Sequence, residues 1–394
     1  MIHDYVPKPK KRILVLVETS RTFGCQIIEG ISRYALEQKE WLLILEDRGP
    51  NDPAPAILRR TPCDGIISRT ASRPMTNALY SHIVPTVELL GDGEVLRPDI
   101  QPDYAAVAKE AFIHFQDRGL CNFAYFSVGH CWWSRELSES FRSLCDAFDR
   151  TCHTAPTEAS ENSVLLPIDL DIHAEKIVAR WLQSLPKPVG ILCPEDAHAI
   201  GLLNICRMNQ ISIPFEVAVL GLGNNTVLCN ATTPRLSSIA INGSDIGYMA
   251  ARHLDQKIRS PRSKFTKEKV GPLYIATRLS TNFTVVEDED VRQALQYASD
   301  HLAEHFTLEH MAQYLNISKR SLIRRFNESL GHPPEKEIMR IRLNRAQELL
   351  IETDMSIGKI ADALGYKASE YFIRVFQQHF GMTPKQFREK VRGA

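Results

Sequence analysis

Residues 12 to about 280 alternate between short apolar runs and longer segments whose apolar positions recur every three or four residues. Ile13–Val17 is a continuous apolar run of strand length, and Cys25–Glu37 follows it with helical spacing. The same alternation predicts strands at Leu42–Leu45, Gly65–Ile67, Pro85–Leu89, Phe123–Val128, Val164–Ile168, Val189–Cys193 and Val217–Leu222, and helices at Tyr104–Arg118, Glu136–Asp149, Ala174–Ser184, Ala197–Met208 and Asp245–Arg259. Strands that alternate with helices in this way form parallel sheets covered by helices.

The alternation occurs twice, before and after about residue 120, which predicts two similar lobes. We therefore expect a two-lobed α/β domain over residues 12–282, with doubly wound parallel sheets, preceded by a basic arm at residues 1–11. The chain is expected to cross back between the lobes near residues 235–280. Ligands of such sheets bind at the carboxyl ends of the strands, where the loops converge.

The pattern changes after residue 283, where an acidic run at 287–290 leads into segments that are helical throughout. We expect a linker at residues 283–289 and an all-α domain at residues 290–394. Two segments of this domain share one design: an apolar helical face, a short break, and a second helix whose first turn is polar. These segments are residues 307–326 and 356–381, with Ser318 and Ser369 as candidate N-caps of their second helices and a long helix, Glu335–Thr353, between them.

A helix, a short turn and a second helix with a polar, basic first turn form the helix-turn-helix arrangement, in which the second helix enters the major groove. From residue 318 onward, 15 Lys and Arg stand against 9 Asp and Glu, a surplus of six that attracts a polyanion. The connecting helix spans roughly 28 Å, close to the ~34 Å between successive major-groove faces. The side chains expected to contact DNA are Ser318, Lys319, Arg320, Ser321, Arg324, Lys367, Ser369, Glu370, Tyr371 and Arg374.

The second segment and the residues after it carry a specific spacing of apolar, glycine and aromatic positions: Ile357, Ile360, Ala361, Gly365, Tyr366, Tyr371, Phe372, Phe376 and the tract Phe380–Pro384. This spacing resembles that of the AraC/XylS-type DNA-binding domain, and the resemblance covers residues 289–394. It implies a double helix-turn-helix that binds operator DNA, and a regulator that contacts RNA polymerase and activates transcription.

A second set of motifs lies in the α/β region: Ser20, Gln26–Gly30, Asp103-Tyr104, Trp133, Phe141-Arg142, Pro194–Asp196, Val219–Asn225 and Leu236–Ser238. They resemble the LacI/periplasmic-binding-protein type of effector domain over residues 12–282. Joined to an AraC-type C-terminus, such a domain is similar to the regulators of xylose operons. The resemblance implies a homodimer that binds a small effector, xylose or a related sugar, between its lobes.

A sugar cleft of this kind presents polar side chains to the hydroxyls and an aromatic face to the ring. The residues expected to bind the effector are Ser20, Arg21, Asp103, Trp132, Trp133, Asp196, Asn224 and Asn225. Paired tryptophans are also common in cores, so Trp132 and Trp133 are candidates for either role. Asp196 ends a predicted strand, where it could contact the ligand or cap the next helix.

Two positions depart from the pattern of the sugar-binding relatives. Gly223 follows the strand Val217–Leu222, where those domains usually carry an acidic residue, and Ile241 lies where a polar glutamine is common. Both changes remove hydrogen-bonding groups from the expected pocket. The alternative is therefore an AraC-type regulator whose pocket binds a non-sugar ligand or a partner protein. A transport component or an enzyme built on the same lobes would not need the two helix-turn-helix segments.

Composition narrows the function further. The chain has 47 Lys and Arg against 47 Asp and Glu, and no apolar run reaches the length of about 18 residues that spans a membrane. The nine cysteines are odd in number and unpaired in spacing, which favours a reducing cytoplasm. No nucleophile, base and orienting group come together, and neither a metal motif nor a complete nucleotide fingerprint is present. We expect a non-enzymatic cytoplasmic protein without a cofactor.

Overall fold

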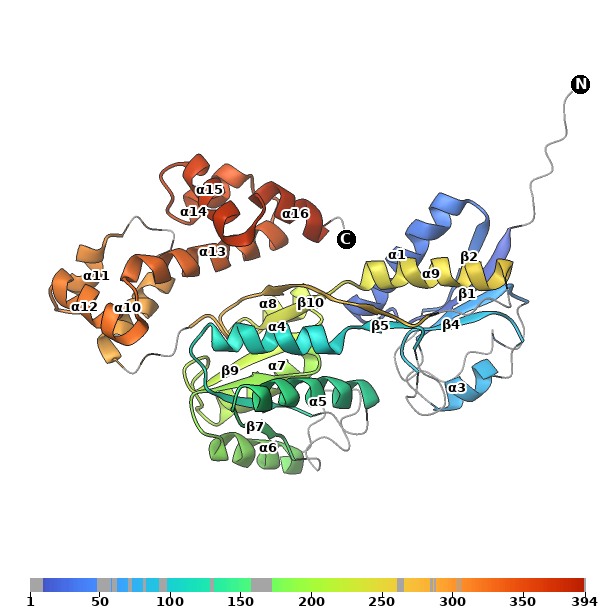
Figure 1. Ribbon diagram of the computed structural model, residues 1–394, viewed down its shortest axis with the longest axis horizontal. Coiled ribbons are helices and arrows are strands. Elements are labelled where there is room, and N and C mark those ends of the chain that lie inside the picture. Colours follow the sequence, from blue (N-terminus) through green and yellow to red (C-terminus); the bar gives the residue numbers. More distant parts are fainter. Residues whose placement is uncertain are drawn as a thin grey trace, which may run out of the picture.

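The computed structural model describes residues 10–47, 58, 62–69, 73–80, 83–91, 98–127, 131–156, 172–260, 266–283, 286, 288–302, 304 and 306–392 (Figure 1). The predicted strand Val164–Ile168 lies outside these residues. Two α/β lobes are followed by a helical domain that lies against the second lobe. Within the described part of the chain, every helix is too short or too polar to cross a membrane.

The first lobe is built on a parallel sheet with the strand order β2-β1-β3-β4. Its strands are β1 (Lys11–Leu16), β2 (Trp41–Leu45), β3 (Gly65–Ser68) and β4 (Thr86–Glu88). Figure 1 shows α1 (Thr22–Gln38) and α9 (Gly243–Arg259) on one face of this sheet and α3 (Arg73–Tyr80) on the other. Alternate residues of β1 serve the two faces: Ile13 packs with the first pair of helices and Leu14 with α3.

The second lobe holds a six-stranded sheet with the order β12-β10-β9-β8-β6-β7. Its strands are β6 (Asn122–Tyr125), β7 (Cys152–Thr154), β8 (Val189–Leu192), β9 (Val217–Leu222), β10 (Ser237–Ile241) and β12 (Pro272–Ala276). The helices of this lobe are α4 (Tyr104–Gln116), α5 (Trp132–Ala147), α6 (Ile172–Ser184), α7 (Asp196–Met208) and α8 (Thr226–Ala231). The core of α4 and α5 is aromatic, with Phe115, Phe123 and Phe141 in contact and fully buried.

The sheets are parallel as expected except at one edge, where β12 runs antiparallel to β10. After β10 the chain crosses to the first lobe and forms α9. It then returns and enters the sheet of the second lobe from the opposite end, as β12. The crossing strands β5 (Ile100–Pro102) and β11 (Glu268–Val270) pair in parallel between the lobes. The first crossing thus lies at residues 100–102, ahead of the boundary near residue 120 that the sequence pattern predicts.

Seven helices make up the described part of the C-terminal domain: α10 (Glu289–Asp300), α11 (Leu308–Tyr314), α12 (Lys319–Leu330), α13 (Pro334–Glu352), α14 (Ile357–Ala363), α15 (Ser369–Phe380) and α16 (Pro384–Arg392). The long helix α13 belongs to two cores. Its residue Ile338 packs with α10 to α12, and its residue Leu350 packs with α14 to α16. The predicted pair of helix-turn-helix units joined by one helix is therefore present.

Helices α1 and α9 pack so closely in the first lobe that Gly247 has no room for a side chain. A Cβ at Gly247 of α9 would lie 1.9 Å from the carbonyl oxygen of Ile27 on α1, so the two helices would have to separate. We expect Gly247→Ala to lower the free energy of unfolding by about 1–3 kcal/mol, as overpacking does, measured by urea denaturation. Gly358→Ala on α14 is the matched control, because a Cβ there meets nothing within 4 Å. Equal losses in both variants would contradict the prediction.

Candidate ligand cleft and DNA-reading helices

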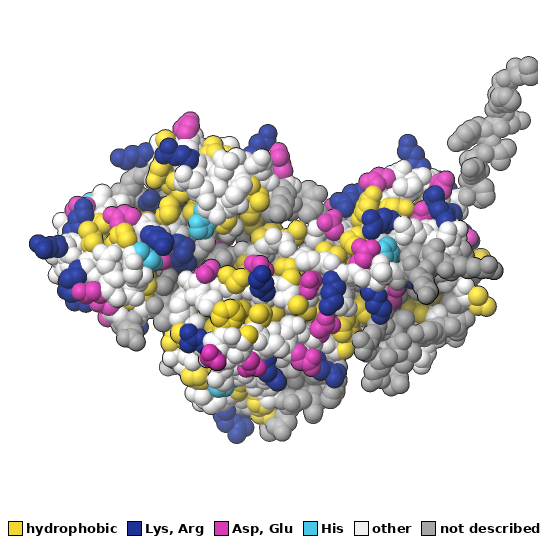
Figure 2. Space-filling view, in the orientation of Figure 1, with side chains coloured by type: hydrophobic (Ala, Val, Ile, Leu, Met, Phe, Trp, Pro, Cys, Tyr) yellow, Lys and Arg dark blue, Asp and Glu magenta, His cyan; other side chains and the backbone are white. Residues whose placement is uncertain are grey.

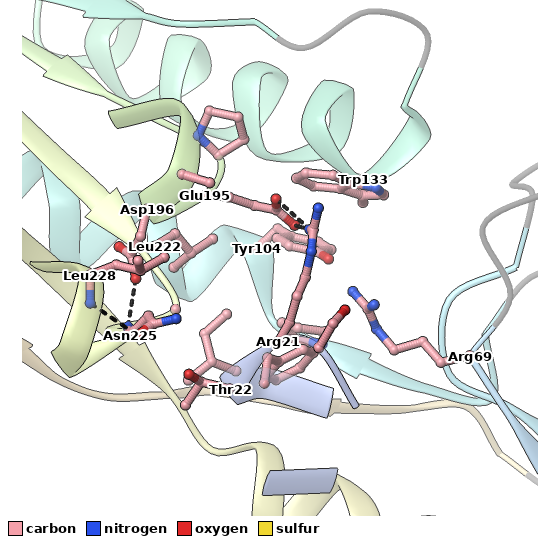
Figure 3. Close-up of a pocket in the computed structure, with 17 residues that line it drawn as sticks. Arg21, Thr22, Arg69, Tyr104, Trp133, Glu195, Asp196, Leu222, Asn225 and Leu228 are labelled. Carbon is pink, nitrogen blue, oxygen red and sulfur yellow. Dashed lines mark hydrogen bonds and ion pairs between the residues drawn. The ribbon is translucent and has the colours of Figure 1, made fainter. Parts of the chain in front are cut away.

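A cavity of about 380 Å³ lies between the lobes, at the carboxyl ends of their parallel strands (Figure 3). The first lobe contributes Arg21 and Phe23 from the segment after β1, and Arg69 from the end of β3. The second lobe contributes Trp133 at the start of α5, the segment 194–197 after β8, and Leu222, Gly223 and Asn225 at the end of β9. Its volume falls in the range of small-molecule sites.

Five of the predicted ligand residues line this cavity, namely Ser20, Arg21, Trp133, Asp196 and Asn225. The other three lie elsewhere. Asp103 accepts a hydrogen bond from the backbone N–H of Ala106 at 3.2 Å and caps α4. The indole N–H of Trp132 donates to the carbonyl of Gly91 at 3.1 Å, so this ring is held outside the cavity. Asn224 is buried behind the turn, 6% exposed.

An ion pair joins the two lobes across the cavity. The guanidinium of Arg21 donates to both carboxylate oxygens of Glu195, at 3.0 and 2.8 Å, as the dashed lines of Figure 3 show. Nearby, Arg69 pairs with Glu18 and lies over the ring of Phe23, 5.2 Å from its centroid. Neither Glu195 nor Arg69 is among the residues that the sequence predicts for the effector site. Arg69 directly follows β3 and Glu195 lies three residues after β8, and this position after an apolar strand is the signal that identifies both.

Asp196 anchors the second-lobe side of the cavity. Its carboxylate is 4% exposed and accepts hydrogen bonds from the hydroxyl of Ser238 and, at 2.7 Å, from the backbone N–H of Asn225. Burial nevertheless raises the pKa of this carboxyl to about 6. A Cβ at Gly221 would lie 2.4 Å from the Oδ1 of Asp196, so the neighbouring strand needs glycine here. Asp196 therefore lines the cavity and also holds the turn after β9.

Apart from Thr22, the rest of the lining is apolar or aromatic. Trp133 and Tyr104 face the cavity from α5 and α4, and Leu222, Leu228 and Ile241 line it from the second lobe. Such a surface covers the ring or alkyl face of a ligand, while the charged groups reach the polar substituents of that ligand.

Among the described residues, no group of three or more His, Cys, Asp or Glu side chains could hold a metal ion.

The expected DNA contacts lie on α12 and α15 and in the turns that precede them. All ten side chains are exposed or half-buried, and Figure 2 shows Lys and Arg side chains over this helical domain, at the left and top of the view. Ser318 caps α12 as predicted, accepting the backbone N–H of Ser321 at 3.1 Å. The prediction for Ser369 is wrong: Ala368 occupies the N-cap position and Ser369 is the first residue of α15.

Several of the basic side chains are restrained by neighbours. Lys319 donates to Glu309 at 2.7 Å, Arg324 pairs with Glu328 at 2.8 Å, and the guanidinium of Arg374 lies 5.3 Å from the ring centroid of Tyr371. Arg320 makes no hydrogen bond or ion pair with the residues that the structure describes. Because these contacts are on the surface, each is weak and exchangeable for a contact with DNA.

Two family models match the chain. Residues 311–390 match a helix-turn-helix domain, and residues 112–281 match a periplasmic binding protein-like domain. The chain therefore combines a periplasmic binding protein-like α/β domain with a helix-turn-helix domain, and it is a DNA-binding transcription regulator.

The similarity extends over nearly the whole length of particular relatives. The chain is 28% identical to the xylose operon regulatory protein of Escherichia coli strain K12, over 96% of this chain and 97% of the relative. The corresponding protein of Haemophilus influenzae is also 28% identical, over 96% of this chain and 98% of the relative. Among solved structures, the xylose-binding transcription activator XylR matches with a TM-score of 0.66 and 26% identity, covering 97% of this chain and 98% of that chain.

The raised pKa of Asp196 makes the stability of the fold depend on pH. An Asp in an unfolded chain has a pKa of about 3.9, so a folded pKa of about 6 means that the folded protein holds the proton more tightly. This group therefore stabilises the fold below about pH 4, and its contribution is lost as the pH rises through about 6. We expect the unfolding free energy of the wild type, relative to Asp196→Asn, to fall by about 1–3 kcal/mol between pH 4 and pH 7.

Denaturation in urea at a series of pH values measures this difference for the two proteins side by side. Asp196→Asn replaces one carboxylate oxygen with an NH₂ group, which cannot accept the hydrogen bond from Ser238 or Asn225. This loss lowers the stability of the variant by an amount that does not change with pH. A wild-type-minus-variant difference that stays flat from pH 4 to pH 7 would show that the carboxyl does not titrate in this range.

Proposed function

We propose that this protein regulates a carbohydrate-utilisation operon in response to a sugar bound between its lobes, with D-xylose or a closely related sugar as the effector. The observation that carries the proposal is the cavity itself, where Trp133 provides an aromatic face and Arg21, Glu195 and Asp196 provide hydrogen-bonding groups. The names of the relatives that match over nearly the whole length support the same class of effector, a sugar. A site built on such groups rejects ligands that leave them unpaired.

One observation favours a second candidate. Gly223 and Ile241 both line the cavity, as does Leu228. At the first two positions we expected acidic and amide side chains from a sugar-binding domain. A less hydroxylated effector, or a partner protein, would use this apolar side of the cavity better than a sugar does.

The remaining parts of the proposal concern how the regulator works. We propose a cytoplasmic homodimer, without enzymatic activity, that activates transcription through contact with RNA polymerase. Operator DNA lies in the cytoplasm, and the dimer and the polymerase contact come from the resemblance to AraC/XylS and LacI-type regulators. All nine cysteines are free thiols, which agrees with a reducing compartment.

We also propose that α12 and α15 are the reading helices, and that Arg320 and Arg374 contact bases. Both side chains are exposed, and an arginine fork binds the guanine edge in the major groove through two hydrogen bonds. The neighbouring Lys319 and Arg324 are then expected to contact phosphates, which position the helix without reading sequence.

A thermal-shift titration with D-xylose tests the effector. We expect the melting temperature to rise with sugar concentration, as mass action requires of a ligand that binds only the folded state. Trp133→Leu should weaken this response about tenfold or more in concentration, because it removes the aromatic face. Trp132→Leu is the matched control, since the adjacent ring lies outside the cavity. No response to pentoses, hexoses or sugar acids in the wild type would favour the second candidate.

Operator binding tests the reading helices. We expect Arg320→Ala and Arg374→Ala each to weaken specific binding by about 1–3 kcal/mol and to relax the sequence preference at one position. Arg180→Ala on α6 removes the same charge from an exposed site in the second lobe and should leave binding unchanged. A loss of affinity that is equal for all DNA sequences would assign the two arginines to phosphates instead.

A further inference from the structure

Several side chains of the DNA-binding domain contact the second lobe, and two of these contacts lie close to the strands β10 and β12. Arg235, in the loop before β10, pairs with Glu348 of α13 at 3.3 Å. Tyr274, on the edge strand β12, packs against Phe387 of α16 with ring centroids 5.9 Å apart and planes at 63°. Figure 1 shows α13 and α16 over this side of the second lobe. These contacts join the reading domain to the lobe that holds one side of the cleft.

The hydroxyl of Tyr274 is hydrogen-bonded to Asn224, a residue next to the cleft. It accepts a hydrogen bond from the side-chain amide of Asn224 at 3.2 Å. The amide oxygen of Asn224 in turn accepts from the guanidinium of the fully buried Arg278 at 3.0 Å, and its backbone N–H donates to Ser238 at 3.0 Å. These bonds fix the amide so that its NH₂ group points to Tyr274.

The turn that contains Asn224 is part of the cleft wall. Its neighbours Gly223 and Asn225 line the cavity, while Asn224 itself is left-handed, with φ of 50°, and faces the opposite side. Asp196 accepts the backbone N–H of Asn225 and the hydroxyl of Ser238, so hydrogen bonds link the turn, the strand β10 and a cavity carboxylate to one another. A ligand that displaces this turn must displace the side chain of Asn224.

On the other side, Phe387 belongs to the core beneath a reading helix. Its ring lies 5.6 Å from that of Phe376 and 6.1 Å from that of Phe380, both on α15. Phe376 lies in turn 5.8 Å from Phe372. The position of Phe387 therefore affects how α15 is held against α16.

We propose that Asn224 and Tyr274 are positioning residues that transmit occupancy of the cleft to the second reading helix. The connection runs from the 223–225 turn through the Asn224 amide to the hydroxyl of Tyr274, and from its ring to Phe387 and α15. This inference rests on the proposed function, because it assigns a route to the response that the proposed effector elicits. A single hydrogen bond and a single ring contact limit the coupling carried by this route to about threefold to tenfold in operator affinity.

The test compares Tyr274→Phe with the wild type in the full chain. This variant keeps the ring on Phe387 and removes only the hydroxyl that Asn224 binds. Tyr248→Phe is the matched control, because it removes a tyrosine hydroxyl bonded to Glu37 at 2.7 Å in the first lobe. Calorimetry measures the D-xylose Kd, and fluorescence anisotropy measures the operator Kd with and without D-xylose. Hydrogen exchange of residues 384–392, measured without sugar, provides a readout that does not depend on the effector.

We expect Tyr274→Phe to keep both the sugar Kd and the sugar-free operator Kd within twofold of the wild type. The factor by which D-xylose changes operator affinity should be at least threefold smaller in this variant than in the wild type. Exchange in α16 should rise in this variant and not in Tyr248→Phe. An undiminished response to D-xylose in Tyr274→Phe overturns the inference and leaves the proposed function standing. If the wild type itself does not respond to D-xylose, the proposed effector is wrong. The hydrogen exchange then decides alone: a rise confined to Tyr274→Phe supports the connection, and unchanged exchange overturns it.

Discussion

The carboxylate of Asp196 is removed from water at the end of β8, and a buried anion is stable only if its oxygens are hydrogen-bonded. The hydroxyl of Ser238 and the backbone N–H of Asn225 supply these bonds from the two next elements of the sheet. This requirement sets the path of the chain after β9, and glycine at 221 leaves room for the carboxylate. The cleft wall and the 223–225 turn therefore depend on how this one group is satisfied, and Asn224 of this turn binds the tyrosine that contacts the DNA-binding domain.

The helical domain depends on α13 in a comparable way. Because this one helix supplies residues to both cores, the two helix-turn-helix units cannot rotate freely about a flexible link. Glu348 of α13 is 4% exposed and lies between Arg345 of the same helix and Arg235 of the second lobe. Separation of the domain from the lobe would break the pair with Arg235 and leave only Arg345 beside the carboxylate, so this pair helps to hold the domain on the lobe. The contact with the second lobe therefore determines how the reading helices α12 and α15 are oriented relative to that lobe.

Most of the architecture could be predicted because continuous apolar runs and helical spacing are local signals. The strands Ile13–Val17 and Val217–Leu222 and the helix before residue 259 were found in this way. Strand β10 was missed because Ser237 and Ser238 make its first half polar, and its antiparallel neighbour β12 depends on a return crossing that no local pattern encodes. The ligand residues divide similarly. Several predicted residues that follow strands do line the cavity, but Glu195 and Arg69 occupy the same kind of position and were not predicted, because the pairing of Glu195 with Arg21 exists only in three dimensions. Adjacent residues of a helix point in different directions, so the sequence does not distinguish Trp133, which lines the cavity, from Trp132. The contacts that keep Asn224 out of the cavity are likewise visible only in the folded chain.

The bond between the lobes is weak enough for a small ligand to control it. Arg21 and Glu195 are 25% and 24% exposed, and ion pairs this accessible contribute about 0–1 kcal/mol. A ligand shifts the balance between open and closed lobes by the ratio of its affinities for the two states, and a ratio of about fivefold, roughly 1 kcal/mol, already matches this ion pair. Interactions of the ligand with the two walls, rather than the ion pair, therefore determine how far the lobes close. Because the 223–225 turn is one of these walls, the same energy acts on the contact that holds the DNA-binding domain.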